Sequence, residues 1–295
     1  MGPGTDPARE IPATAKLNLT LHVTGRRADG YHTLDGLTVF CTLADRVRVI
    51  PGGERDRVIV DGPFAGHITG PELAEATVRA FRDRFGPLPR VEIRITKRIP
   101  VAAGLGGGSA DAAAVLRALA ALCPVPPDRG ALHRLALELG ADVPACLDGV
   151  PVRVRGIGEC LVPLGPLPPL PVVLVNPGVA LPTGQVFRQR EGGYSRCEPL
   201  PPEPLDAEGL FRYLGERANN DLIGAACAVA PVVATVLETL ADAQEPRCHG
   251  MSGSGATCFG LFDEGAHEGA RALAERLASH GWWSSAATLA SRTTA

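Results

Sequence analysis

The sequence predicts an α+β fold. Segments with alternating apolar residues, typical of strands, stand beside segments whose apolar residues recur at helical spacing. An Asp-Gly pair at 29–30 separates two strand candidates and favours an antiparallel hairpin. Past residue 149 the sequence changes to short strand candidates and a proline-rich stretch, which predicts two domains, 1–150 and 151–295.

The N-terminal half alternates strands and helices. Residues 17–23 alternate strictly, which predicts a half-buried strand with Lys16 and Asn18 on its polar face. Apolar spacing then predicts two strand runs within 34–50, a helix over 73–85, a strand over 91–95, an alanine-rich helix ending at Cys123-Pro124, and a helix from Asp128 to Leu139. Asp128 is expected to cap that last helix, and Gly140 to end it in the left-handed conformation.

The C-terminal half continues in the same mixed manner. Its predicted elements are short strands over 152–154, 160–164 and 172–175, an exposed loop over 189–205, helices over 206–216 and 218–241, a strand over 256–262, a helix over 266–279 and a final strand over 285–290. No repeat of solenoid period occurs.

Composition narrows the class of protein. The 295 residues are 45% hydrophobic and 21% charged, so a large core can form and disorder is excluded. A net charge of −3 disfavours nucleic acid as a partner, because duplex binding needs concentrated positive charge. The eight cysteines form no CxxC pair, and neither a signal peptide nor a long apolar span is visible. We expect a soluble, cytoplasmic protein with reduced core thiols, without membrane partners, and a monomer or weak homodimer.

A glycine-rich loop at 104–109 is the strongest single motif. Backbone free of side chains can approach a phosphate closely, and the helix that follows offers unpaired N–H groups to an anion. The loop does not match GxxxxGK[ST], because no lysine follows a glycine in this chain, and it does not match GxGxxG, because Ser109 stands in the last position. A flexible loop or tight helix–strand packing is the alternative reading. Ser109 could cap the helix, coordinate a metal that bridges phosphates, or do both.

Several segments together resemble the GHMP small-molecule kinases. They are Ala15-Lys16-Leu17-Asn18-Leu19, the run from Thr24 to Thr33 with Arg-Ala-Asp-Gly-Tyr-His, Pro100 to Ala113, Gly140-Ala141-Asp142-Val143-Pro144, Pro177-Gly178-Val179 and Gly253-Ser254-Gly255-Ala256. The resemblance preserves their order from residue 15 to about 260. It implies an N-terminal βαβ-type domain, a C-terminal ferredoxin-like domain, and both ligands in the cleft between them.

The resemblance also implies an activity: ATP-dependent phosphorylation of an alcohol, with Mg²⁺ bridging the phosphates. Asp142 corresponds to the catalytic base, and Lys16 to its partner, which helps neutralise the transferred group or orient the acceptor oxygen. The ATP loop corresponds to Pro100, Val101, Ala102, Ala103, Gly104, Leu105, Gly106, Gly107, Gly108, Ser109 and Ala110. Ala102, Ala103 and Ala110 depart from the family pattern, and the first two matter only where φ is positive.

The Arg-Ala-Asp-Gly-Tyr-His run is typical of the branch of the family whose alcohol carries a cytidyl diphosphate, made on the non-mevalonate route to isoprenoids. Tyr31 could stack on cytosine, and His32 can offer one donor and one acceptor to its edge. The resemblance assigns substrate contacts to Asn18, Tyr31, His32, Asp142, Phe187, Gly253 and Ser254. From the sequence alone, Phe187 reads as a core residue. Asn219-Asn220-Asp221 matches a family pair for which helix capping is the alternative to ligand contact.

Two other functions remain open at this point. One is a GHMP kinase for a different alcohol, such as mevalonate or homoserine, which Tyr31 and His32 disfavour because those substrates carry no base. The other is a non-catalytic nucleotide-binding regulator, whose mark would be loss of the lysine or the aspartate. Both Lys16 and Asp142 are present.

Overall fold

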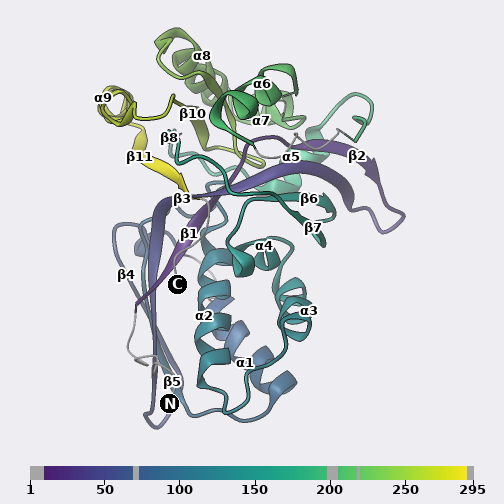
Figure 1. Ribbon diagram of the computed structural model, residues 1–295, viewed down its shortest axis with the longest axis vertical. Coiled ribbons are helices and arrows are strands. Elements are labelled where there is room, and N and C mark those ends of the chain that lie inside the picture. Colours follow the sequence, from purple (N-terminus) through teal and green to yellow (C-terminus); the bar gives the residue numbers. More distant parts are fainter. Residues whose placement is uncertain (1–9, 69–72, 198–204, 218–219, 291–295) are drawn as a thin grey trace.

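The computed structural model describes residues 10–68, 73–197, 205–217 and 220–290. Figure 1 shows two groups of helices, α1 to α4 in one half and α6 to α9 in the other, with the long strand β3 running between them. The mixture of helices and largely antiparallel strands confirms the predicted α+β fold.

The N-terminal sheet is built around β3 (His32–Pro51), which pairs antiparallel with β1 (Ile11–Asn18) and with β2 (His22–Arg26). The expectation of one strand over 17–23 is wrong, because the chain leaves the strand between Asn18 and His22. There it passes so close to β3 that a Cβ on Gly36 would lie 2.4 Å from the Thr20 carbonyl oxygen. The strand is also buried on both faces, since Lys16 and Asn18 are only 7% and 8% exposed.

The remaining N-terminal elements pack on this sheet. They are β4 (Arg57–Asp61), a short 3₁₀ helix (Ala65–His67), α1 (Leu73–Phe85), β5 (Val91–Thr96), α2 (Gly107–Leu122), α3 (Arg129–Leu139) and α4 (Val143–Asp148). The predictions for α1, β5, α2 and α3 are confirmed, whereas β4 and α4 were not predicted. Phe81 of α1, Ile93 of β5 and Leu116 of α2 meet in one core cluster that excludes water from this half.

Helix α3 tests the two capping predictions separately. The Asp128 carboxylate accepts a hydrogen bond from the Ala131 amide at 2.9 Å, so the predicted N-cap is confirmed. The prediction for Gly140 is wrong, because its φ of 166° is extended backbone rather than left-handed. The chain therefore continues straight into Asp142 and the first turn of α4.

The strands that follow residue 150 join the N-terminal sheet. Strand β6 (Val152–Gly156) pairs with β3 and with β7 (Cys160–Pro163). A division of the chain into domains at residue 150 stays a prediction.

The C-terminal half has the βαββαβ arrangement of ferredoxin-like folds. Its sheet runs in the order β11-β8-β10-β9. In chain order its elements are β8 (Pro171–Asn176), α5 (Thr183–Gln189), α6 (Ala207–Arg217), α7 (Ile223–Val229), α8 (Val232–Ala243), β9 (Cys248–Met251), β10 (Cys258–Leu261), α9 (His267–Ala278) and β11 (Trp283–Ala290).

The helix predicted over 218–241 is two helices, α7 and α8. Pro231 stands between them and has no backbone N–H to continue the first helix, which therefore ends at Val229. Strand β9, which follows α8, was not predicted. Residues 218–219 and part of the predicted loop, 198–204, lie outside the described residues.

Strand β11 connects the two halves. Its first six residues pair with β8, and Leu289 and Ala290 pair with β3, so one sheet continues from β4 to β9. Within the described ranges, no helix is both long and apolar enough to cross a lipid bilayer.

All eight cysteines are free thiols. The expectation that they lie in the core is right for Cys41, Cys146 and Cys258, which are buried, and wrong for Cys160 and Cys197, which are exposed.

Candidate active site

A cavity of about 1160 Å³ lies where β1, the β2–β3 hairpin, the glycine loop and α5 come together. Its wall collects residues that are far apart in the sequence. Of the predicted site residues, it contains Lys16, Asn18, Tyr31, His32, Ala102, Gly104, Gly106, Asp142, Phe187, Gly253 and Ser254. A single concave site of this size can hold two small ligands side by side.

Lys16 and Asp142 meet at one side of this cavity. The Lys16 ammonium lies 3.0 Å from a carboxylate oxygen of Asp142 and donates to the Asn18 amide oxygen at 2.9 Å. Asn18 in turn donates to the Thr38 hydroxyl at 2.8 Å, so the side chains of β1 and β3 fix the ammonium in place. The Lys16 side chain is 8% exposed and that of Asp142 is 46% exposed. The carboxylate is therefore held on its buried side and open to the cavity on the other.

The position of Asp142 explains its availability. It precedes α4 at the capping position, yet its side chain makes no capping hydrogen bond. The first turn of α4 contains Pro144, which has no N–H to be capped. The carboxylate is thus left to pair with Lys16.

The glycine loop packs directly against Lys16. Gly106 has a φ of +64°, and a Cβ there would lie 2.6 Å from Cγ of Lys16. Gly104 has a φ of +76°, and a Cβ there would lie 2.6 Å from the Ser252 carbonyl oxygen. Both glycines are therefore needed for close packing, whereas a Cβ on Gly108 would meet open space. The alternative interpretation of this loop, tight packing, is therefore correct for Gly104 and Gly106. At Gly108 the start of α2 is still accessible.

Not all predicted loop residues reach the cavity. Ala103, Leu105 and Ala110 are buried in the cores, and the cavity wall does not include Pro100, Val101, Gly107, Gly108 or Ser109. The predicted cap by Ser109 is wrong, because α2 begins at Gly107 and Gly106 takes the capping position. Ala102 has a φ of +53°, a left-handed conformation unusual for alanine. Alanine in place of the family's usual glycine at residue 102 therefore strains the backbone.

The other end of the cavity carries the predicted base-binding residues. The His32 and Phe187 rings stack, with centroids 5.0 Å apart and planes inclined by 19°. Tyr31 is 64% exposed at the tip of the hairpin. Phe187 is partly buried and lines the cavity. Burial lowers the pKa of His32 below its usual 6.5, and the nearby positive charges of Arg26 and Arg190 lower it further. The imidazole is thus neutral at pH 7 and offers one donor and one acceptor.

The second glycine turn, 252–255, links these parts. The Ser252 hydroxyl accepts from the Asn18 amide at 3.1 Å and donates to the Gly104 carbonyl at 2.9 Å. Ser254 bonds the Thr183 hydroxyl of α5 at 2.9 Å. The turn therefore holds β1, the glycine loop and α5 in one arrangement.

The cavity wall also contains residues that were not predicted. Arg26, Arg188, Arg190 and Tyr194 all line it. Tyr194 carried a usable signal, because the chain has only three tyrosines. Arg26 stands in the family run from Thr24 to Thr33, although no role was predicted for it. Arg188 and Arg190 carried no signal, since nearly all positive charge in this chain is arginine.

In the part of the chain that is described, no group of three or more His, Cys, Asp or Glu side chains is placed to hold a metal ion.

The fold and this cavity define a small-molecule kinase of the GHMP class, and the comparisons agree: residues 72–150 match the model of the GHMP kinases N-terminal domain. The chain belongs to the family of 4-diphosphocytidyl-2-C-methyl-D-erythritol kinases. It is 48% identical to the enzyme of that name from Paramagnetospirillum magneticum, over 95% of this chain and 98% of the relative. It is 49% identical to the one from Paracoccus denitrificans, over 96% and 97%.

A solved structure points the same way. The crystal structure of a 4-(cytidine 5'-diphospho)-2C-methyl-D-erythritol kinase superposes with a TM-score of 0.79 at 40% identity, covering 96% of this chain and 99% of that one. The predicted GHMP kinase fold is thereby confirmed.

Proposed function

We propose that the protein transfers the γ-phosphoryl group of ATP to the 2-hydroxyl of 4-diphosphocytidyl-2-C-methyl-D-erythritol, a step of non-mevalonate isoprenoid synthesis. The observation that carries this proposal is the sharing of one cavity by the Lys16–Asp142 pair and the Tyr31, His32 and Phe187 group. The Lys16–Asp142 pair can activate an alcohol for phosphoryl transfer, and the aromatic group can bind a nucleobase.

Asp142 is the group that takes the proton of the acceptor alcohol. The O–H bond of the alcohol breaks, a new bond forms from its oxygen to the γ-phosphorus, and the bond from that phosphorus to the β-bridging oxygen breaks to release ADP. A general base of this kind contributes about 10²–10⁴-fold to a rate. The ion pair to Lys16 fixes the carboxylate on one side and leaves its other side free to receive the proton.

Lys16 supplies positive charge beside the reacting oxygens. Its ammonium has three donors, and the contacts above use two of them, on Asp142 and Asn18. The third can point to the acceptor oxygen or to the transferred group, where negative charge accumulates. The flexible lysine stem is held by Gly106, so the charge is positioned before ligands arrive.

ATP binds along the glycine loop with its phosphates toward the start of α2. The open space at Gly108 and the unpaired N–H groups of the first helical turn suit an anion. The Ser109 hydroxyl in that first turn is the protein group that would hold Mg²⁺ when the ion is bound with ATP, and the ion would supply positive charge to the phosphates.

The cytidyl end of the substrate lies between the hairpin tip and α5. A neutral His32 matches the ring-nitrogen acceptor and the exocyclic amine of cytosine, and Tyr31 adds stacking worth about 1–3 kcal/mol. Asn18, Gly253 and Ser254 lie toward the reacting end and contact the diphosphate and the sugar alcohol. Mevalonate and homoserine would leave the aromatic end of the cavity unused, so these alcohols rank second. The cytoplasmic location and the monomeric or weakly dimeric state stay predictions.

The test is an ADP-release assay with purified protein, ATP and Mg²⁺. It compares the cytidyl substrate, its uridyl analogue, mevalonate and homoserine at equal concentration. We expect turnover with the cytidyl substrate and kcat/KM at least about 10-fold lower with the uridyl analogue, because a mismatched donor–acceptor edge leaves polar groups unpaired. Preference for mevalonate or homoserine would replace the proposed substrate, and tight ATP binding without turnover would favour the non-catalytic regulator.

A further inference from the structure

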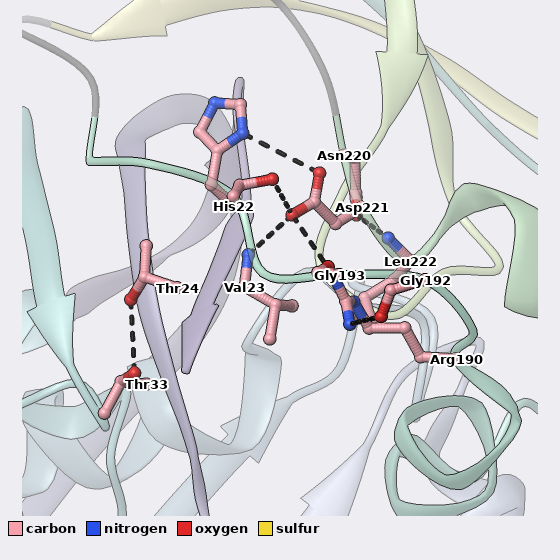
Figure 2. Close-up of polar contacts among 11 residues, drawn as sticks. His22, Val23, Thr24, Thr33, Arg190, Gly192, Gly193, Asn220, Asp221 and Leu222 are labelled. Carbon is pink, nitrogen blue, oxygen red and sulfur yellow. Dashed lines mark hydrogen bonds and ion pairs between the residues drawn. The ribbon is translucent and has the colours of Figure 1, made fainter. Parts of the chain in front are cut away.

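Asp221 is a buried carboxylate that does not line the cavity itself but lies near Arg190, which does. Figure 2 shows its contacts with His22 and Val23. Its side chain is 7% exposed. One carboxylate oxygen accepts hydrogen bonds from the backbone N–H of Val23 at 2.8 Å and from the Ser195 hydroxyl at 2.6 Å. The other lies 3.8 Å from Nδ1 of the buried His22. A carboxylate that collects donors from separate segments fixes those segments relative to each other.

The first of these segments is the loop 190–195. Arg190 donates to the carbonyl oxygens of Gly192 and Gly193, and its guanidinium lies 3.8 Å from Asp221 and 5.6 Å from the ring centre of Tyr194. The Ser195 amide donates to the Val23 carbonyl at 2.9 Å. Asp221 thus holds the loop at Ser195 and approaches it again at Arg190, and between these two points lie Gly192 and Tyr194 of the cavity wall.

The second segment is the β2–β3 hairpin. Val23 lies on β2, so both of its backbone polar groups are used, one by Asp221 and one by Ser195. Farther along the hairpin, the Thr24 and Thr33 hydroxyls bond each other at 3.1 Å across the two strands (Figure 2). Thr33 directly follows His32 in the chain. Fixing Val23 therefore fixes the base of the hairpin whose tip presents Tyr31 and His32.

The neighbouring residue, Asn220, performs a different task. Its amide donates to the Met251 and Gly253 carbonyls at 2.7 and 2.8 Å, which ties it to the glycine turn at the phosphate side of the cavity. Its side-chain oxygen accepts from the Leu222 amide, and Leu222 rather than Asn220 caps α7. Neither Asn220 nor Asp221 lines the cavity, so neither the predicted cap nor the predicted ligand contact describes them. Asn219 lies outside the described residues.

We propose that Asp221 is a positioning residue for cytidyl recognition: it sets the distance between the hairpin that carries His32 and the α5–loop segment that carries Phe187, Arg190 and Tyr194. The inference rests on the proposed function and names a determinant of its substrate affinity. Asp221 touches neither ligand. Removing the Asp221 carboxylate should weaken binding of the cytidyl group and leave the reacting centre in place. The Lys16–Asp142 pair is held by its own contacts, on β1 and at the start of α4.

The test is steady-state kinetics of Asp221→Asn, with Asp206→Asn as the matched control. Asn keeps the size of the side chain but removes its negative charge, which weakens the hydrogen bonds from Val23 and Ser195 and the attraction of the Arg190 guanidinium. Asp206 accepts from the Gly209 amide at the exposed start of α6, where Asn serves equally well. For Asp221→Asn we expect KM for the cytidyl substrate to rise about 10-fold, the typical effect of losing one hydrogen bond to a charged group, with kcat and the KM for ATP unchanged within about 2-fold.

Ser195→Ala is the second variant, since it removes one donor and leaves the carboxylate in place. We expect a rise of about 3-fold in the same KM, again without change in kcat. Thermal unfolding of each variant verifies its fold. If Asp221→Asn does not fold, the KM values of Ser195→Ala decide the proposal. An unchanged KM for the cytidyl substrate, or an equal rise in the KM values for the cytidyl substrate and for ATP, would overturn the positioning role of Asp221. Absence of wild-type turnover on the cytidyl substrate would instead refute the proposed function.

Discussion

The Lys16 ammonium lies 3.0 Å from a carboxylate oxygen of Asp142, although one residue belongs to the first strand and the other to the turn before α4. The contact needs the glycine loop beside it, because any side chain at Gly106 would occupy the space of the lysine stem. Three separate stretches of sequence therefore build one reacting centre.

Asp142→Asn removes the proton acceptor while keeping its shape. We expect kcat to fall by about 10²–10⁴-fold, with KM for ATP and for the cytidyl substrate changed little, since the variant loses an interaction made in the transition state. Asp128→Asn is the control, because an asparagine caps α3 as well as the aspartate does. A kcat for Asp142→Asn near that of the control would remove Asp142 from the reaction.

Gly106→Ala should impair the reaction without touching a charged residue. The new Cβ would stand 2.6 Å from Cγ of Lys16 at a backbone φ of +64°, so either the loop or the lysine must shift. A displacement of about 1 Å in a reacting group costs roughly 10²-fold in rate. Stopped-flow or steady-state kcat measures the effect.

Gly224→Ala serves as the control for that variant. It lies in α7, where an added Cβ meets nothing within 4 Å, and it should keep full activity with slightly higher helix stability. If both glycine variants retained wild-type kcat, the close approach of the loop to Lys16 would have no role in catalysis.

Tyr31→Ala tests the stacking role at the hairpin tip. The side chain is 64% exposed, so its loss should leave the melting temperature unchanged. We expect KM for the cytidyl substrate to rise about 10-fold and KM for ATP to stay constant, in line with a stacking free energy of about 1–3 kcal/mol. Tyr31→Phe keeps the ring and should behave like wild type. Equal weakening of both substrates would indicate a structural defect instead.

Asp56 gives a stability prediction that is independent of the site. Its carboxylate accepts from Arg82 at 2.5 and 2.9 Å, from the Val91 amide at 2.9 Å and from Arg90 at 3.1 Å. These hydrogen bonds, those from Arg82 foremost, hold the pKa of Asp56 well below its usual range. A carboxyl whose pKa is lower in the folded state stabilises the fold above its unfolded pKa and loses this contribution as the pH falls.

Asp56→Asn should therefore lower the free energy of unfolding at pH 7 by about 1 kcal/mol, a value reduced for partial exposure of the pair. The difference from wild type should shrink from about pH 5 downward. Urea unfolding at pH 7.0 and 3.5 measures it, with the exposed Asp242→Asn as control. A difference that grew on acidification would contradict the role given to Asp56.

Much of the fold was predictable because local patterns and tertiary packing agree. The apolar residues that recur at helical spacing in α1 and those that alternate in β5 pack into the same hydrophobic core. The prediction failed where packing overrides local pattern. The strand expected over 17–23 alternates well, yet the close approach to Gly36 breaks it.

For the site, motif resemblance supplied what spacing could not. Nothing in the local pattern places Lys16 beside Asp142, because that contact depends on how β1 and α4 meet. Arg190 carries no sequence signal, and Asp221 was noted only in a motif read as a helix cap or a ligand contact. The three-dimensional arrangement alone brings the two residues together beside the hairpin.

The most direct test of the central claim is a double-mutant cycle on kcat with Lys16→Met, Asp142→Asn and the double variant. Because the two side chains act as a unit, we expect the double variant to be no slower than the slower single variant, with both KM values near wild type. Effects on kcat that multiplied, as they do for independent residues, would contradict the shared role of the pair.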